Sequence, residues 1–183
     1  MALACLALWR DDLPAQAPLV IEDVAVASMG ATDSVETGRT VVIIDGRIAA
    51  ITPAGTAKIP EGARRVSGTG GLLVPGFWNG HVHLFTAEGT ERDLLARARN
   101  VLGPRWLEAG VTTVVDLGAP TAIALAWRTA ARARDIQAPR AVVSGQLLGG
   151  VNRYAPGAAW NAQLGTADAA VDSVDALLAA GVD

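Results

Sequence analysis

The chain has 183 residues, of which 51% are hydrophobic and 18% are charged. This composition excludes an intrinsically disordered protein and allows one ordinary domain with a sizeable core. Fifteen lysines and arginines stand against eighteen aspartates and glutamates, a formal net charge of −3. No basic surplus indicates a nucleic-acid partner, and no apolar run approaches the roughly 20 residues of a membrane span.

The N-terminal residues 1–18 are expected to be a leader or a disordered segment. A short apolar run is followed by Ala15-Gln16-Ala17, which resembles a signal-peptidase site, but no basic residue precedes the run. The pattern favours the cytoplasm and leaves a periplasmic or exported location open if the segment is a clipped signal peptide. Cys5 is the only cysteine, which excludes a disulfide framework and a multi-cysteine zinc site.

Residues 19–70 predict a small β-sandwich-like domain. The segments 19–26 and 39–44 are strand-like, and 47–51 returns as a partner strand. Asp45-Gly46 between the last two is a strong signal for a tight hairpin. The glycine-rich run 68–71 lacks the lysine of a phosphate-binding loop and precedes a strand, so it indicates a turn.

From residue 71 to residue 183, strands alternate with helices. Strands are expected at 72–74, 111–116 and 140–143, and helices at 91–109, at 121–134 and from Thr166 to Gly181. Gly103-Pro104 should kink or restart the first helix. Residues 145–165 form a long glycine-rich loop, and a fourth strand should begin at 182–183. The alternation predicts an α/β fold with a parallel sheet covered by helices.

We interpret this second region as the first three to four units of a (β/α)8 TIM barrel. So few parallel strands leave an exposed apolar edge, so we expect a truncated part of a longer barrel protein.

The two histidines of the chain, His81 and His83, are two residues apart after the run 72–80. Residues i and i+2 of a strand point to the same face, so both imidazoles should project together at the strand end, where barrel active sites lie. Two imidazoles suit a divalent cation such as zinc. A His-x-His alone also fits surface or hydrogen-bonded loop histidines, so the decision depends on the surrounding sequence.

The segment Pro75-Gly76-Phe77-Trp78-Asn79-Gly80-His81-Val82-His83, together with 107–118 and 139–145, resembles the N-terminal part of metal-dependent amidohydrolases. The closest likeness is to the branch of imidazolonepropionase-like and prolidase-like enzymes, and it covers nearly the whole chain from about Leu19. The resemblance implies hydrolysis of amide, peptide or cyclic amide C–N bonds through metal-activated water. It implies that His81 and His83 are ligands of one or two divalent ions, with zinc as the first candidate. It also implies a small-molecule or peptide substrate, and it is compatible with a homo-oligomer of the full-length protein.

Two departures from the family pattern matter. Asn79 stands where many members have aspartate, and its amide can still hydrogen-bond near the ligands. By resemblance, later strands supply a bridging carboxylated lysine, two further histidines and an aspartate, so the catalytic residues are expected beyond Asp183. The chain by itself is therefore expected to bind metal weakly and to turn over no substrate. A non-catalytic remnant of the fold and a self-contained α/β binding module stay open as alternatives.

Several other polar and aromatic residues have a structural interpretation beside a functional one. Asp116, at the end of the second strand, is expected to cap the following turn or helix rather than to serve the metal site. Residues of the long loop border a substrate pocket or are solvated: Asn152, Arg153 and Tyr154. A solvated helix face is expected for Arg128, Arg132 and Arg134, and a packing role for Trp78 and Trp106.

Overall fold

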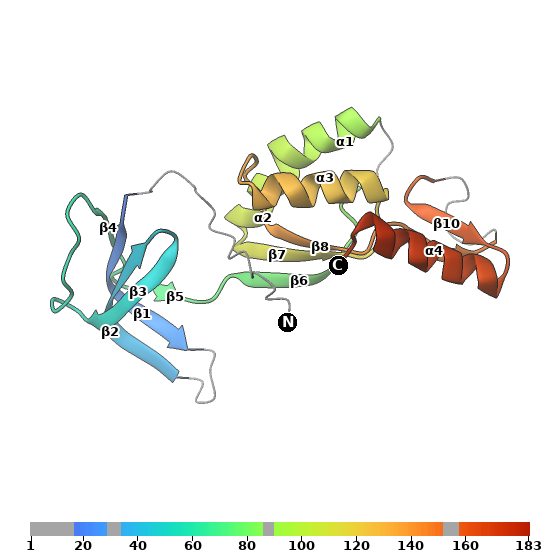
Figure 1. Ribbon diagram of the computed structural model, residues 1–183. Coiled ribbons are helices and arrows are strands. Elements are labelled where there is room, and N and C mark those ends of the chain that lie inside the picture. The colour runs from blue at the N-terminus through green and yellow to red at the C-terminus, as the bar shows by residue number, and fades with distance from the viewer. Residues whose placement is uncertain (1–16, 29–33, 86–89, 152–157) are drawn as a thin grey trace, which may run out of the picture. The chain divides into compact units, whose positions relative to one another are not determined.

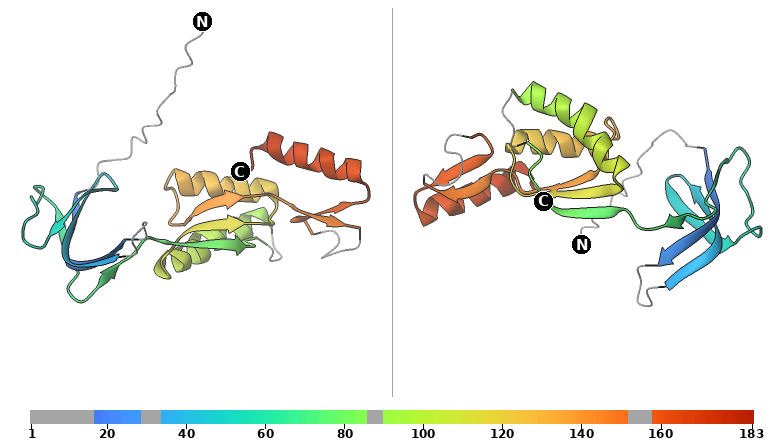
Figure 2. Two further views of the ribbon diagram at one scale, coloured as in Figure 1. Left: turned by 90° about the horizontal axis from the view of Figure 1, so that it is seen from below. Right: turned by 180° about the vertical axis from the view of Figure 1, so that it is seen from behind.

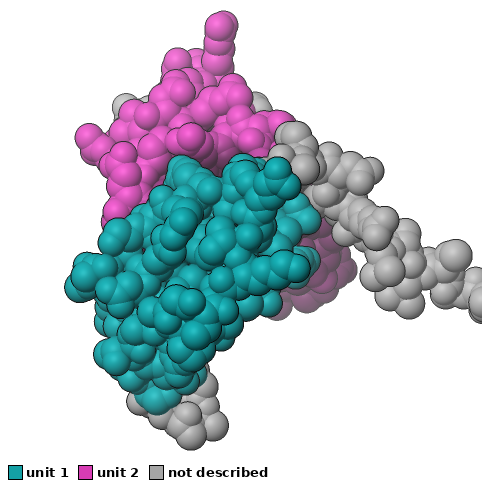
Figure 3. Space-filling model, turned by 90° about the vertical axis from the view of Figure 1, so that its left-hand side faces the viewer, with its two compact units in different colours: residues 1–75 teal, residues 76–183 magenta. Residues whose placement is uncertain are grey.

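The computed structural model describes residues 17–28, 34–85, 90–151 and 158–183. The chain divides into two compact units, residues 1–75 and 76–183 (Figure 3). Each unit is described by itself below. Most of the predicted leader, Cys5, and the loop residues Asn152, Arg153 and Tyr154 lie outside the described residues.

The first unit contains one curved five-stranded sheet (Figure 2). Its strands are β1 (Leu19–Ser28), β2 (Ser34–Ile44), β3 (Arg47–Pro53), β4 (Arg64–Ser67) and β5 (Leu72–Leu73). The order is β3-β2-β1-β4, with β5 pairing farther along β1. The β1–β2 and β2–β3 pairs are antiparallel, whereas β4 and β5 run parallel to β1. The described residues of this unit thus form a single mixed sheet where a sandwich-like pair of layers was expected.

The tight turns of this unit follow the sequence pattern. Asp45 and Gly46 have φ angles of 51° and 71°, the two positive values that a type I′ hairpin turn needs. This confirms the predicted hairpin between β2 and β3. The Gly71 amide donates to the Gly68 carbonyl at 2.8 Å, so the glycine-rich run is a turn, as predicted.

The strand expected at residues 72–74 belongs to a different sheet from the one predicted. Leu72 and Leu73 pair with Ala25 and Val26 of β1, so they do not open the parallel sheet. Pro75 has no amide hydrogen and cannot continue a strand ladder. A new strand, β6, therefore begins only at Phe77.

The second unit contains a three-stranded parallel sheet in the order β6-β7-β8 (Figure 1). Its strands are β6 (Phe77–Val82), β7 (Val111–Asp116) and β8 (Arg140–Val143), and a separate parallel pair is formed by β9 (Leu147–Gly150) and β10 (Asn161–Leu164). The helices are α1 (Glu91–Arg97), the π-helical turn η1 (Ala98–Leu102), α2 (Gly103–Glu108), α3 (Thr121–Arg132) and α4 (Ala167–Ala180). This architecture is α/β, as predicted, and the described residues form no closed barrel.

The core of this unit lies between the sheet and the helices α1 and α3. Trp127 of α3 is 1% exposed and stacks edge-on against Phe85, with ring centroids 5.6 Å apart. The same cluster contains Leu94 and Ala98 from the first helical stretch and Val114 from the central strand. Apolar residues at helical spacing and a β-branched strand thus meet where the periodicity predicts.

The helix predicted at residues 91–109 is interrupted, as Gly103-Pro104 indicated. The π-helical turn ends at Leu102, and α2 restarts at Gly103 with proline in its first turn. A Cβ atom at Gly103 would lie 2.3 Å from the Gln137 carbonyl oxygen. Glycine is therefore required at this position by close packing.

The region after β8 differs from the prediction in two respects. The expected loop 145–165 contains the β9–β10 pair, which lacks the β-branched runs that signal a strand. Helix α4 has the predicted ends, with the Thr166 hydroxyl accepting from the Ala169 amide and Gly181 at φ 87°. Its apolar stripe is not buried, however, since Val171 and Leu178 are each 60% exposed. No described helix is long and apolar enough to cross a membrane.

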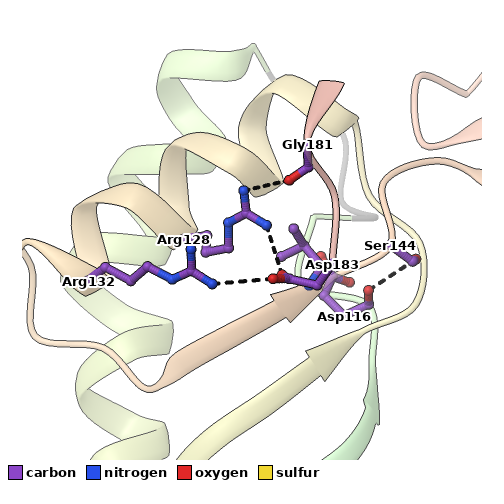
Figure 4. Close-up of polar contacts among 7 residues, drawn as sticks. Asp116, Arg128, Arg132, Ser144, Gly181 and Asp183 are labelled. Carbon is purple, nitrogen blue, oxygen red and sulfur yellow. Dashed lines mark hydrogen bonds and ion pairs between the residues drawn. The ribbon is translucent and has the colours of Figure 1, made fainter. Parts of the chain in front are cut away.

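Asp183, which follows the Gly181 cap of α4, lies beside β8. The Asp183 amide donates to the Val143 carbonyl at 3.0 Å, and the Val143 amide donates to the Asp183 carboxylate at 3.0 Å. Arg128 pairs with the same carboxylate at 2.8 Å and donates to the Gly181 carbonyl at 2.7 Å (Figure 4). The side chain of Arg128 is only 13% exposed. The predicted solvated face is thus wrong for Arg128, because the returning chain covers it.

Of the remaining side-chain predictions, those for Arg132, Arg134 and Trp106 agree with the structure and the one for Trp78 does not. Arg132 also reaches Asp183, at 3.2 Å, but stays 57% exposed, and Arg134 is exposed beyond the helix end. Trp106 packs against the core, as predicted. Trp78 is 66% exposed, so the packing role predicted for it is wrong for the described residues.

Candidate metal centre

The two histidines lie at the carboxyl end of β6. His81 is the penultimate residue of the strand, and His83 follows directly after its last residue, Val82. Their Nε2 atoms are 3.3 Å apart, and the rings meet edge-on with centroids 5.1 Å apart. The structure therefore brings the two predicted ligands together with one nitrogen of each facing the other.

The backbone around His81 is shaped by Asn79. The Asn79 side-chain oxygen accepts a hydrogen bond from the His81 amide at 3.1 Å. The pairing register between β6 and β7 shifts between Asn79 and Val82, so the strand is irregular where the histidines are placed. The amide at position 79 thus acts on the backbone that carries the first histidine.

Asp116 ends the neighbouring strand, β7, and is 1% exposed. Its Oδ1 atom accepts from the amide of Leu84, the residue after His83, at 3.3 Å. The prediction was a cap of the following turn or helix. Helix α3 begins after Pro120 without a side-chain cap, but the Asp116 carboxylate accepts from the Gly118 amide in the turn after β7. Asp116 also ties the end of β7 to the segment that follows the second histidine.

The Asp116 side chain is buried and only partly hydrogen-bonded. Its Oδ2 atom has no hydrogen-bond partner among the described residues. Burial raises the pKa of the Asp116 carboxyl above its ordinary value, and the backbone amides of Leu84 and Gly118 and the charge of His83 oppose this rise only in part. The Asp116 backbone carbonyl accepts from the Ser144 amide and hydroxyl (Figure 4), which links it to the end of β8 as well.

Gly118 is a site residue that the sequence reasoning missed. Its carbonyl oxygen lies 3.4 Å from His83 Nδ1, and a Cβ atom on Gly118 would lie 3.0 Å from the same nitrogen. The available signal was its position, two residues after the end of a strand that neighbours the histidine strand. Loops after neighbouring parallel strands lie at the same edge of the sheet.

A cavity of about 240 Å³ borders the second histidine. Its lining is mostly apolar and comes from the end of β6 and the first helical stretch: Val82, His83, Leu84, Leu94, Arg97, Leu102 and Trp106. A larger hollow of about 940 Å³ between α1 and α3 includes neither histidine. We therefore take the smaller cavity as the one related to the histidine pair.

The described residues contain no cluster of three or more histidine, cysteine, aspartate or glutamate side chains with metal-binding geometry. The histidine pair is thus a two-nitrogen donor set, fewer than the three or four protein ligands of ordinary zinc sites.

Comparison with known proteins shows which proteins this chain resembles. No family model matches the sequence. An adenine deaminase of Deinococcus deserti is 40% identical over 83 residues, covering 37% of this chain and 14% of that protein. A structure from Bifidobacterium longum, assigned as a prolidase, is 28% identical over 92% of this chain and 40% of its own, with a TM-score of 0.76.

The chain belongs to the amidohydrolase superfamily. The structure of a prolidase in complex with N-methylphosphonate-L-proline is similar over 90% of this chain and 45% of its own, with a TM-score of 0.74. Its sequence identity is 18%, so this is a likeness of fold alone. Phenylurea hydrolase B is 27% identical over 91% of this chain and 39% of its own, with a TM-score of 0.56. The chain therefore spans less than half the length of these relatives, and the predicted superfamily is confirmed.

Proposed function

We propose that this chain is the N-terminal part of a metal-dependent hydrolase of C–N bonds, in which His81 and His83 bind a divalent ion. Zinc is the first candidate for this ion. The observation that carries the proposal is the separation of the two Nε2 atoms. Zinc binds imidazole nitrogen at about 2.0–2.1 Å in tetrahedral geometry, so two nitrogens on one ion lie about 3.3–3.4 Å apart. The observed separation is 3.3 Å.

The chemistry of the pair supports a cation between the two rings. Two unprotonated Nε2 atoms at this distance repel each other unless a proton or a metal ion lies between them. A divalent ion held here would supply Lewis-acid activation of water and of a substrate carbonyl. The protein's own contribution is positional: Asn79 holds the backbone of His81, and Asp116 holds the amide that follows His83.

The arrangement of the second unit supports a larger barrel. The strands follow one another in space in the order of the sequence, β6-β7-β8, as they do in a (β/α)8 barrel. The Asp183 amide bonds to the Val143 carbonyl at the free side of β8, where a fourth parallel strand would pair. The exposed stripe of α4, with Val171 and Leu178, is the kind of face that a further barrel element would cover.

The substrate class we infer is a peptide or a cyclic amide. The prolidase likenesses extend over about nine-tenths of this chain, whereas the likeness to adenine deaminase covers 37% of it. Deamination is the second candidate, on the strength of the 40% identity in that stretch. Both reactions break a C–N bond with water, so the histidine pair serves either.

A metal titration tests this proposal. Titrating the purified chain with Zn²⁺ or Co²⁺ by calorimetry should show one ion per chain, with a dissociation constant weaker than about 1 µM because only two ligands are supplied. His81→Ala and His83→Ala should each weaken binding at least about tenfold. Cys5→Ser is the matched control and should keep the affinity, since a thiolate is the other strong zinc ligand in the sequence.

Two outcomes would contradict the proposal. Unchanged affinity in both histidine variants would remove the ligand assignment. Submicromolar affinity together with hydrolysis of proline dipeptides by the 183-residue chain would show a complete site and overturn the partial one. Binding without any hydrolysis agrees with the proposal.

A further inference from the structure

The carbonyl oxygen of Gly118 lies 3.4 Å from one ring nitrogen of His83, Nδ1. A carbonyl oxygen only accepts hydrogen bonds, so a hydrogen bond at this contact needs the hydrogen on Nδ1. A neutral imidazole carries one N–H group, and His83 Nε2 therefore holds a lone pair. That lone pair points at His81, whose Nε2 is 3.3 Å away.

The Gly118 carbonyl is held in place by the buried end of β7. Gly118 is buried, and Asp116 two residues earlier is 1% exposed. The Asp116 carboxylate accepts from the Leu84 amide, and its carbonyl accepts from Ser144. The segment 116–118 is thus attached to both neighbouring strands, so its carbonyl is a fixed acceptor.

The absence of a side chain at position 118 is also required. A Cβ atom there would lie 3.0 Å from His83 Nδ1 and 3.3 Å from Cε1, closer than ordinary contact. The φ angle of Gly118 is not in the positive range, so an alanine would be accepted by the backbone. Its methyl group would instead displace the imidazole ring.

We propose that Gly118 is a positioning residue that fixes His83 as the Nδ1–H tautomer, while His81 changes tautomer when a cation binds. Without an ion, His81 donates its Nε2–H to the His83 Nε2 lone pair. With an ion between the rings, the His81 proton leaves Nε2 and the opposite nitrogen, Nδ1, takes up a proton from water, with no net change of charge. The tautomer of His83 stands apart from the proposed metal site. The tautomer change at His81 rests on that proposed site.

The test is a two-bond ¹H–¹⁵N correlation spectrum of the imidazoles, which is simple because the chain has 2 histidines. It is recorded on the wild-type chain at about pH 8.5, above the ordinary imidazole range, and assigned with His81→Ala and His83→Ala. Without metal, we expect Nδ1–H for His83 and Nε2–H for His81. On adding Zn²⁺ alone, His81 should convert to Nδ1–H and His83 should keep its form.

Gly118→Ala should give His83 a mixture of tautomers and weaken Co²⁺ binding about tenfold, the usual effect of losing a partner behind a metal ligand. Gly80→Ala is the matched control, since Gly80 adjoins His81 and a Cβ there meets nothing within 4 Å. The tautomer of His83 and the affinity for Co²⁺ should both stay unchanged in Gly80→Ala. Far-UV circular dichroism reports whether Gly118→Ala folds, and the wild-type spectrum tests the tautomer without any substitution.

The outcomes separate the two proposals. An Nε2–H His83 in the wild-type chain, or an unchanged tautomer and affinity in a folded Gly118→Ala variant, overturns the role of Gly118. An Nδ1–H His83 that becomes mixed in Gly118→Ala, in a chain that binds neither Zn²⁺ nor Co²⁺, supports the positioning role and overturns the metal site. A His81 tautomer that is unchanged on Zn²⁺ binding overturns the proposed change at His81.

Discussion

Replacing Arg128 with methionine should destabilise the second unit by about 2 kcal/mol. The Arg128 side chain is 13% exposed, and its guanidinium group joins two parts of the chain, by an ion pair with Asp183 at 2.8 Å and a hydrogen bond to the Gly181 carbonyl at 2.7 Å. Methionine keeps most of the aliphatic packing of the side chain. The substitution therefore removes mainly the polar contacts that hold the return from α4 to the sheet.

The magnitude follows from the burial of both partners. Removing one member of a fully buried ion pair costs about 3–5 kcal/mol, because the other charge stays without a partner. The Asp183 side chain is 27% exposed and also accepts from the Val143 amide, so water and that bond replace part of the loss. This exposure lowers the expected cost to about 2 kcal/mol.

The assay is urea unfolding followed by far-UV circular dichroism, with Arg132→Met as the matched control. Arg132 lies one helical turn farther along α3 and pairs with the same carboxylate at 3.2 Å, but it is 57% exposed. An exposed pair of this kind contributes about 0–1 kcal/mol. If Arg128→Met costs no more than Arg132→Met, the argument from burial is refuted.

The same contacts predict a dependence on pH. Burial tends to raise the pKa of the Asp183 carboxyl, but the hydrogen bonds from Arg128 and the Val143 amide, with the charges of Arg128 and Arg132, outweigh it and hold the pKa below its ordinary value of 3.8. The unfolded chain then binds more protons than the folded one below that pH. The contribution of Asp183 is present above pH 3.8 and is lost as the pH falls through the lower folded-state value, so the gap between wild type and Arg128→Met should narrow in acid.

Two further substitutions test the helix ends and the packing. Thr166→Ala should lower the free energy of unfolding by about 1 kcal/mol through loss of the cap at 3.1 Å; a helix content and urea midpoint equal to those of wild type would contradict this. Gly103→Ala should destabilise by about 1–3 kcal/mol in the same urea assay despite the better helix propensity of alanine, since its Cβ would lie 2.3 Å from the Gln137 carbonyl. Gly165→Ala, where a Cβ meets only Val151 at 3.7 Å, is the control, and equal effects at both glycines would disprove the packing argument.

The sequence predicted the features that depend on neighbours along the chain. The Asp45-Gly46 hairpin, the strand at Arg140–Val143 and the Thr166 cap all follow from local propensity, and each is found. The pairing of His81 and His83 belongs to this class too, because alternation along a strand places residues i and i+2 on one face.

Features that depend on distant partners were predicted less well. Leu72 and Leu73 form a strand, as predicted, but nothing local indicates that β1 is its partner. The β9–β10 pair lies in a glycine-rich segment, where propensity opposes a strand and only pairing creates one. The sequence pattern predicts Arg128 to be an exposed helix residue, because its partner Asp183 lies 55 residues later in the chain.

By itself, then, the sequence determined the superfamily, the α/β alternation and the two histidines as a pair, because these are properties of local pattern and spacing. Only the tertiary structure decided what surrounds the pair. Asp116 was expected to cap the following turn or helix, and besides the Gly118 amide in that turn it holds the amide of Leu84, the residue after His83. Gly118 was marked in the sequence only by its position after the end of β7, yet its carbonyl oxygen lies against the His83 ring. The physical reason is that a hydrogen bond between neighbouring strand ends joins residues more than thirty positions apart, and no periodicity in the chain records it.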